Sequence, residues 1–151
     1  MQNSFPIRLE RALSKLYTAF NEQTLNPECC KQCAAGNIAD HKDAWKHFSD
    51  SHGSLELNYV GKVHEIMGRK INGYLPSELL HIERIFLQSC GYQVPLHKNN
   101  SAIKTPKNTE MLYEGLSGVI SYLCALDGVA NVMDITRVFE EVLERSSVLE
   151  V

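Results

Sequence analysis

Apolar residues recur at the spacing of an α-helix in almost every segment of this chain of 151 residues. Residues three or four positions apart lie on one face of a helix, so this spacing predicts helices that each bury one stripe of apolar side chains. Strand-like alternation at Leu55, Leu57 and Tyr59 gives way to helical spacing, and a lone strand there has no partner with which to pair. The pattern therefore predicts an all-α protein.

Proline and glycine mark the ends of several predicted helices. Pro6 lies near the first turn of one helix, and Pro76 begins the clearest one, with Gly91 where a C-terminal cap belongs. An apolar stripe over 112–123 forms another helix, closed by Asp127-Gly128. We expect a single domain of about five to seven helices over residues 1–151.

The remaining segments are less regular. A short helix around Trp45 should end near Gly53, a further helix should end near Gly68, and Asp134 should cap the last one. Residues 92–108 are polar and lack helical spacing, which is typical of a mobile loop.

Three of the five cysteines lie in the short segment CCKQC, residues 29–33. Asn26 followed by Pro27 and Glu28 predicts a helix start, which would place Cys29 in a first turn that favours a thiolate. Cys29 and Cys33 would then share one face of that helix, whereas Cys30 would lie about 100° around it.

The cysteine cluster is compatible with several kinds of chemistry. Zinc or iron could bind to Cys29, Cys30 and Cys33, with His52 as a further ligand, although a second pair of ligands is missing from the sequence. The pair Cys30 and Cys33 has CxxC spacing but no βαβ context for a redox motif. Two further alternatives are small cysteines that pack where helices approach closely, with Cys30 as the one to be buried, and a reactive Cys29 in a small-molecule pocket.

Two further side chains could support a site. His52 lies in the polar turn SDSHG, where a solvated loop histidine is the commoner outcome and a base or ligand the alternative. Glu83 lies among apolar residues of its helix, so it must reach water at a helix edge or find a partner on another helix. The candidate catalytic residues are therefore Cys29, Cys33, His52 and Glu83.

The charge balance and the N-terminus exclude several classes of protein. The formal net charge is −3, which provides no basic field for nucleic acid. The N-terminus lacks the pattern of a signal peptide, and no apolar run reaches the roughly 18 residues of a membrane span. We therefore expect a cytoplasmic protein with reduced thiols.

Three segments resemble a family of small proteins from Bacteroidota that are often labelled as a component of the sodium-translocating NADH:quinone reductase, namely its NADH-oxidising flavoprotein. They are NPECCKQCAAGNI, SDSHGSLELNYVGKVHE and GYLPSELLHIERIFLQSCGY. The resemblance implies a cytosolic, all-helical protein and supplies no catalytic residue.

The motifs of the genuine reductase flavoprotein are absent from this sequence. The genuine reductase flavoprotein looks like a membrane-anchored protein that contains a plant-type ferredoxin domain. The cysteines of that domain follow a Cys-x4-Cys-x2-Cys spacing. CCKQC lacks the four-residue spacer, and no GxGxxG motif follows a predicted strand. No flavin, NADH or iron–sulfur cofactor is therefore expected.

The sequence leaves two functions open. The first is a binding or interaction protein, with a small molecule, another protein or a second copy of the chain as its partner. The second is a redox or metal site built on residues 29–33. We favour the first, because the sequence contains no complete catalytic constellation.

Overall fold

Five α-helices and one 3₁₀-helix form the described part of this computed structural model, residues 6–94 and 109–130. In chain order they are α1 (Ile7–Asn21), α2 (Ala34–Ile38), η1 (Ala44–Phe48), α3 (Tyr59–Ile66), α4 (Pro76–Cys90) and α5 (Thr109–Leu126). Within these residues the only β-type pairing is an isolated bridge between Ile71 and Tyr74. The prediction of an all-α protein is confirmed.

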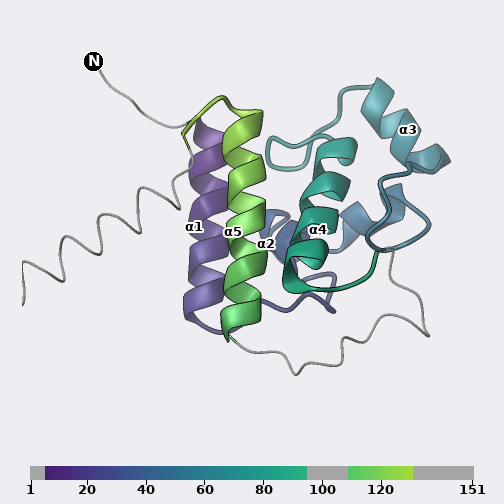
Figure 1. Ribbon diagram of the computed structural model, residues 1–151. Helices are drawn as coiled ribbons and strands as arrows, with labels where there is room; N and C mark the ends of the chain where they lie inside the picture. Colours follow the sequence, from purple (N-terminus) through teal and green to yellow (C-terminus); the bar gives the residue numbers. More distant parts are fainter. Residues whose placement is uncertain (1–5, 95–108, 131–151) are drawn as a thin grey trace, which may run out of the picture.

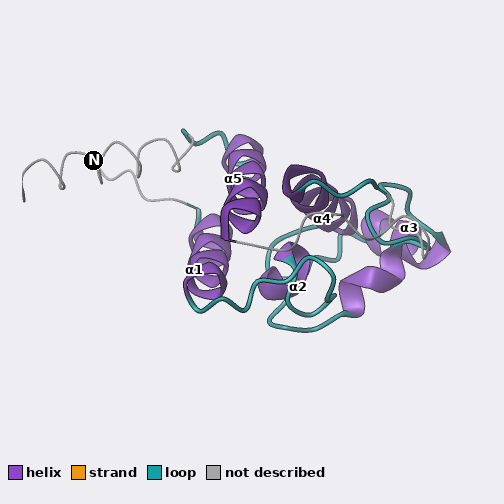
Figure 2. Cartoon of the chain, turned by 60° about the horizontal axis from the view of Figure 1, so that its bottom comes forward, coloured by secondary structure: helices purple, strands orange, loops and turns teal. Residues whose placement is uncertain are grey.

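The helices α1 and α5 lie side by side and run in opposite directions, and α4 packs against α5 (Figure 1). The short helix α2 contacts both α1 and α4, while α3 and η1 lie on the far side of α4 (Figure 2). Apolar side chains from α1, α2, η1, α4 and α5 fill one buried cluster. None of the helices in the described part is long and apolar enough to cross a membrane.

Glycine allows α4 and α5 to approach closely. A Cβ atom at Gly115 would lie 2.8 Å from the ring of Phe86 and would overlap the sulfur of Cys90. One turn later on α5, a Cβ atom at Gly118 would likewise overlap the side chain of Ser89. Because α5 covers one face of α4, the other sides of α4 are left for α2, η1 and α3.

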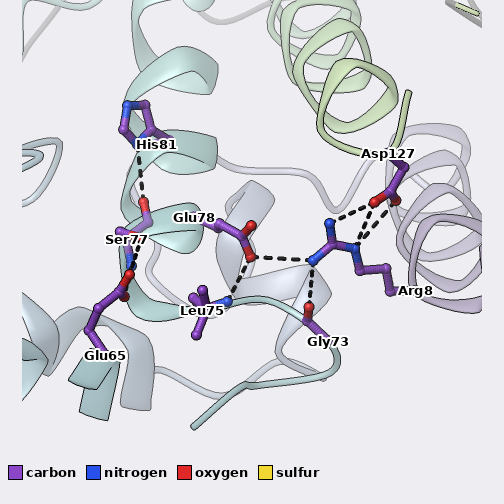
Figure 3. A network of polar contacts seen from close by, with 8 residues as sticks. All are labelled: Arg8, Glu65, Gly73, Leu75, Ser77, Glu78, His81 and Asp127. Carbon is purple, nitrogen blue, oxygen red and sulfur yellow. Dashed lines mark hydrogen bonds and ion pairs between the residues drawn. The ribbon is translucent and has the colours of Figure 1, made fainter. Parts of the chain in front are cut away.

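Arg8 ties the two ends of the described chain together (Figure 3). Its guanidinium donates to Asp127 through Nη2 at 2.6 Å and Nε at 3.0 Å, and its Nη1 donates to the carbonyl of Gly73 at 2.7 Å. Glu78 accepts from the same Nη1 at 3.3 Å, and the ring of Tyr74 lies 4.6 Å from the guanidinium carbon. We call these five residues the Arg8 cluster.

The start of α4 is secured by two carboxylates (Figure 3). Glu78 accepts the backbone N–H of Leu75 at 2.9 Å. Glu65 of α3 accepts both the N–H of Ser77, at 3.0 Å, and its hydroxyl, at 2.7 Å. These N–H groups have no partner inside the helix, so the two side chains replace the missing bonds and join α3 to α4.

Most helix ends that the sequence predicts are observed. Pro6 immediately precedes α1, Pro76 begins α4, and Gly91 follows α4 with a φ of 105°, as an αL cap requires. The helix before Gly68 is confirmed but begins only at Tyr59. Residues 95–108 of the expected loop and the helix expected after Asp134 lie outside the described residues.

The prediction that a helix starts at Asn26 is wrong. The Asn26 side chain accepts from the N–H of Glu28 at 2.9 Å, and the Asn26 N–H donates to the carbonyl of Gln32 at 2.8 Å, which closes a compact loop. The helix begins only at Ala34, with Cys33 as its N-cap. Cys29 and Cys33 therefore do not share a helix face.

The short helix around Trp45 is also shorter than predicted. It is a 3₁₀-helix that ends at Phe48, and the chain then turns through Gly53, whose φ is +92°. This left-handed conformation favours glycine. The turn redirects the chain immediately after His52.

Candidate metal centre

Three side chains from distant parts of the sequence meet in the interior: Cys33, His52 and Glu83. One ligand atom of each, the Cys33 Sγ, a His52 ring nitrogen and a Glu83 carboxylate oxygen, all lie within 4.8 Å of one another. Cys33 precedes α2, His52 follows η1, and Glu83 lies in the middle of α4. We call these residues the Cys-His-Glu cluster.

Glu83 is fully buried on α4, where it meets the start of α2 and the turn that carries His52. Its Oε1 accepts the N–H of Ala35, in the first turn of α2, at 3.3 Å. Its Oε2 lies 2.8 Å from Nε2 of His52. A buried carboxylate without partners would cost several kcal/mol, roughly, and these two contacts offset that cost.

His52 is fixed by its neighbours on both sides. Its side chain is 18% exposed, and its ring makes an edge-type contact with the ring of Trp45, with the centroids 5.6 Å apart. The chain then turns at Gly53, which packs closely against the side chains of Leu87 and Val94. The commoner outcome that the sequence suggested for His52, a solvated loop residue, is therefore wrong, because the turn folds back onto α4.

Cys33 has no solvent exposure. Its sulfur accepts the N–H of Gly36 at 3.3 Å, and its S–H donates to the carbonyl of Cys30 at 3.6 Å. Burial raises the pKa of the Cys33 thiol well above its ordinary value, and the negative charge of Glu83 raises it further. In the metal-free protein the thiol therefore keeps its proton.

A cavity of about 380 Å³ lies beside the cluster. Of the three cluster residues, only His52 lines this cavity, together with Cys30 and Trp45. The rest of its wall is mainly polar and contains Lys46, His47, Ser49, Asp50, Ser51, Asn58 and Leu80. Solvent or a small ligand can therefore approach the cluster along the side formed by His52 and Cys30.

The structure brings together three of the four candidate catalytic residues. Cys33, His52 and Glu83 form the cluster, whereas Cys29 is not one of its members. Cys29 and Cys30 are both half-buried, and Cys30 lines the cavity. The expectation that Cys30 would be the buried cysteine of the segment is wrong, because Cys33 is the fully buried one.

Sequence reasoning missed the role of Trp45 in this site. Its indole N–H donates to the carbonyl of Cys30 at 2.9 Å while its ring packs on His52, so one side chain positions two segments. A buried tryptophan needs an acceptor for its N–H, and that general rule is the only signal the sequence contained. The acceptor itself depends on the fold.

The fold and the cluster together define a small all-α protein with a buried Cys-His-Glu arrangement. The chain matches no protein-family model, no curated protein and no solved structure. The resemblance to the Bacteroidota family therefore stays a prediction, and the function must be argued from the cluster.

Proposed function

We propose that this protein binds one divalent transition-metal ion through Cys33, His52 and Glu83, in the reducing environment of the cytoplasm. The observation that carries the proposal is the convergence of their three ligand atoms within 4.8 Å. Tetrahedral bonds of about 2.0–2.3 Å place ligand atoms about 3.5 Å apart, so the three side chains need only small adjustments to enclose an ion. The Glu83 carboxylate is held between the N–H of Ala35 and the ring of His52, which supports its proposed role as a ligand.

Zinc suits this set of ligands better than iron. Thiolate, imidazole and carboxylate are the three kinds of group that zinc binds in proteins, and a thiolate selects against harder ions. The mononuclear iron sites that activate oxygen use two histidines and one carboxylate instead. A thiolate and a carboxylate together balance the charge of Zn²⁺, which favours burial of the ion.

A cysteine nucleophile activated by His52 is a weaker explanation of the same three residues. A nucleophile needs a thiolate and access to its substrate. The Cys33 sulfur is fully buried and its pKa is raised. These properties suit a ligand that loses its proton to an incoming metal ion.

Purified wild-type protein is expected to bind one equivalent of Zn²⁺ or Co²⁺. At a free metal concentration 100 times the dissociation constant, binding should stabilise the folded state by about 2.7 kcal/mol, seen as a higher Tm. Cys33→Ala and His52→Ala should lose both the equivalent of metal and the gain in Tm. Elemental analysis of dialysed protein and thermal melts with and without metal provide the measurements.

The control is Cys124→Ala, which removes another buried thiol, one on α5 that lies outside the Cys-His-Glu cluster. This variant should keep its metal. The proposal is contradicted if wild-type protein binds less than one equivalent, or if Cys124→Ala loses the metal as Cys33→Ala does.

A second candidate function is association through α3, which the exposure of its apolar side chains favours. Tyr59 is 81% exposed, Ile66 84% and Met67 58%. Large apolar side chains that gather on one exposed helix commonly mark a contact surface. The partner that we propose is a second copy of the chain.

Ile66→Asp combined with Met67→Asp should abolish this association without lowering Tm, because both side chains are exposed in the monomer. We expect wild-type protein to show a concentration-dependent dimer in sedimentation velocity, and the double variant to remain monomeric. Ile7→Asp, at an exposed position on α1, is the control and should still dimerise. Wild-type protein that is monomeric at every concentration would rule this function out.

A further inference from the structure

Cys30 lies at the side of the Cys-His-Glu cluster that faces the cavity. Cys33 and Glu83 are fully buried, so neither reaches the cavity wall. His52 and Cys30 both line that wall. An ion held by the cluster would therefore have its remaining coordination position on the side where the Cys30 thiol lies.

The backbone of Cys30 is held directly beside Cys33 and Trp45. Its carbonyl oxygen accepts the indole N–H of Trp45 at 2.9 Å and the Cys33 thiol at 3.6 Å. The absence of a Cβ at Gly36 lets α2 approach this same carbonyl. The Cys30 thiol is not among the three ligand atoms that meet there, so its side chain must turn toward the cluster to bind the ion.

The spacing of Cys30 and Cys33 also suits a shared ion. Two cysteines separated by two residues are a recurrent pair of ligands in tetrahedral zinc sites. The cluster supplies three ligands, and a tetrahedral ion takes four. Cys29 does not line the cavity, so Cys30 is the better placed of the two neighbouring thiols.

We propose that Cys30 is the fourth and exchangeable ligand of the ion, a proposal that rests on the metal site proposed above. The cavity admits a small thiol, which replaces Cys30 on the ion. In this exchange the incoming thiol forms a sulfur–metal bond and gives its proton to the departing Cys30 thiolate. No electron is transferred, and the number of thiolates on the metal stays at two.

The cavity suits a small polar thiol. Its volume of about 380 Å³ lies in the range of small-molecule sites. Lys46 and Ser51 line it and provide polar groups. Only a ligand as soft as a thiolate competes well with Cys30 for such an ion.

The number of thiolates on the metal tests the role of Cys30. Co²⁺ reports this number through the intensity of its sulfur-to-metal charge-transfer band in the near ultraviolet. Wild-type protein should show the intensity of two thiolates, and Cys30→Ser or Cys30→Ala about half of it. Cys29→Ser, which changes the adjacent thiol, is the matched control and should keep the full intensity.

The results separate the two proposals. Wild-type protein that takes up no Co²⁺ overturns both. Uptake of Co²⁺ with equal charge-transfer intensity in wild type and in both Cys30 variants overturns the exchangeable ligand alone. A loss of intensity in Cys29→Ser that matches the loss in Cys30→Ser overturns it as well.

Addition of 2-mercaptoethanol to Co²⁺-loaded Cys30→Ser tests access through the cavity. The small thiol should bind at the open position and restore the charge-transfer band to wild-type intensity. In wild-type protein it should change the visible Co²⁺ bands while the charge-transfer intensity stays constant. Failure of the thiol to restore the band in Cys30→Ser would overturn the proposal that the cavity leads to the metal.

Discussion

Glu83→Ala is expected to lower the free energy of unfolding of the metal-free protein by about 3 kcal/mol and to abolish metal binding. The carboxylate is fully buried and bonded to Ala35 and His52. Its removal leaves the Ala35 N–H without an acceptor and creates a cavity against α2. Denaturant unfolding in the presence of a chelator measures the loss of stability without any contribution from metal.

Glu83→Gln separates the structural role of this residue from metal binding. A glutamine keeps the volume, accepts from the Ala35 N–H and can donate to a neutral His52, so its unfolding free energy should fall by only about 1 kcal/mol. It carries no negative charge, and its affinity for Zn²⁺ should fall by about 100-fold or more. Titration with Zn²⁺ against a competing chelator measures this affinity.

Two outcomes would contradict these expectations. Glu83→Gln with wild-type affinity for Zn²⁺ would show that the carboxylate is no ligand. Glu83→Ala with unchanged stability would show that the buried contacts contribute nothing. Glu114→Ala, at an exposed position on α5, is the control and should change stability by less than about 0.5 kcal/mol.

Arg8→Met should have the second-largest effect, a loss of about 2 kcal/mol from the free energy of unfolding. The side chain of Asp127 is only 8% exposed and accepts hydrogen bonds from both Nε and Nη2 of the guanidinium. Without Arg8 this carboxylate and the carbonyl of Gly73 lose their charged partner. The Arg8 side chain is itself 23% exposed, and solvent screening keeps the loss below that of a fully buried pair. Thermal and denaturant unfolding measure it.

An ion pair on the surface provides the comparison for Arg8. Lys46 and Asp43 lie 3.4 Å apart with side chains 44% and 38% exposed, so Asp43→Asn should leave the free energy of unfolding almost unchanged. Combining Arg8→Met with Asp127→Leu should recover part of the loss, because the second change removes the unpaired carboxylate. Equal effects of Arg8→Met and Asp43→Asn would contradict a special role for the Arg8 cluster.

Helix ends were predictable where proline or glycine determines them. Pro76 and Gly91 act through their own backbone preferences, which no distant contact is needed to reveal. Asn26 was misleading because an asparagine before Pro-Glu suits two local structures. Its side chain can cap a helix or close a turn, and here the loop closed by Gln32 decides between them.

The candidate site was predictable in its residue types but not in its assembly. The apolar neighbours of Glu83 indicated a carboxylate that needs a partner. That partner, His52, lies 31 positions away in a polar turn, and nothing in that turn's sequence indicates that it folds onto α4. The spacing of the cysteines in CCKQC suggested a helical pair, whereas the tertiary fold unites only Cys33 with the cluster.

The bond between Arg8 and Asp127 joins residues that are 119 positions apart. Closing so long a loop costs more chain entropy than closing the short loops that bring α2, η1 and α4 together. Contacts at such long range form late in folding unless other contacts have already shortened the path between them. The packing of α4 against α5 provides that shortcut, so we expect the pairing of α1 with α5 to complete a core that the middle of the chain has already begun. The Cys-His-Glu cluster lies entirely within that middle part of the chain.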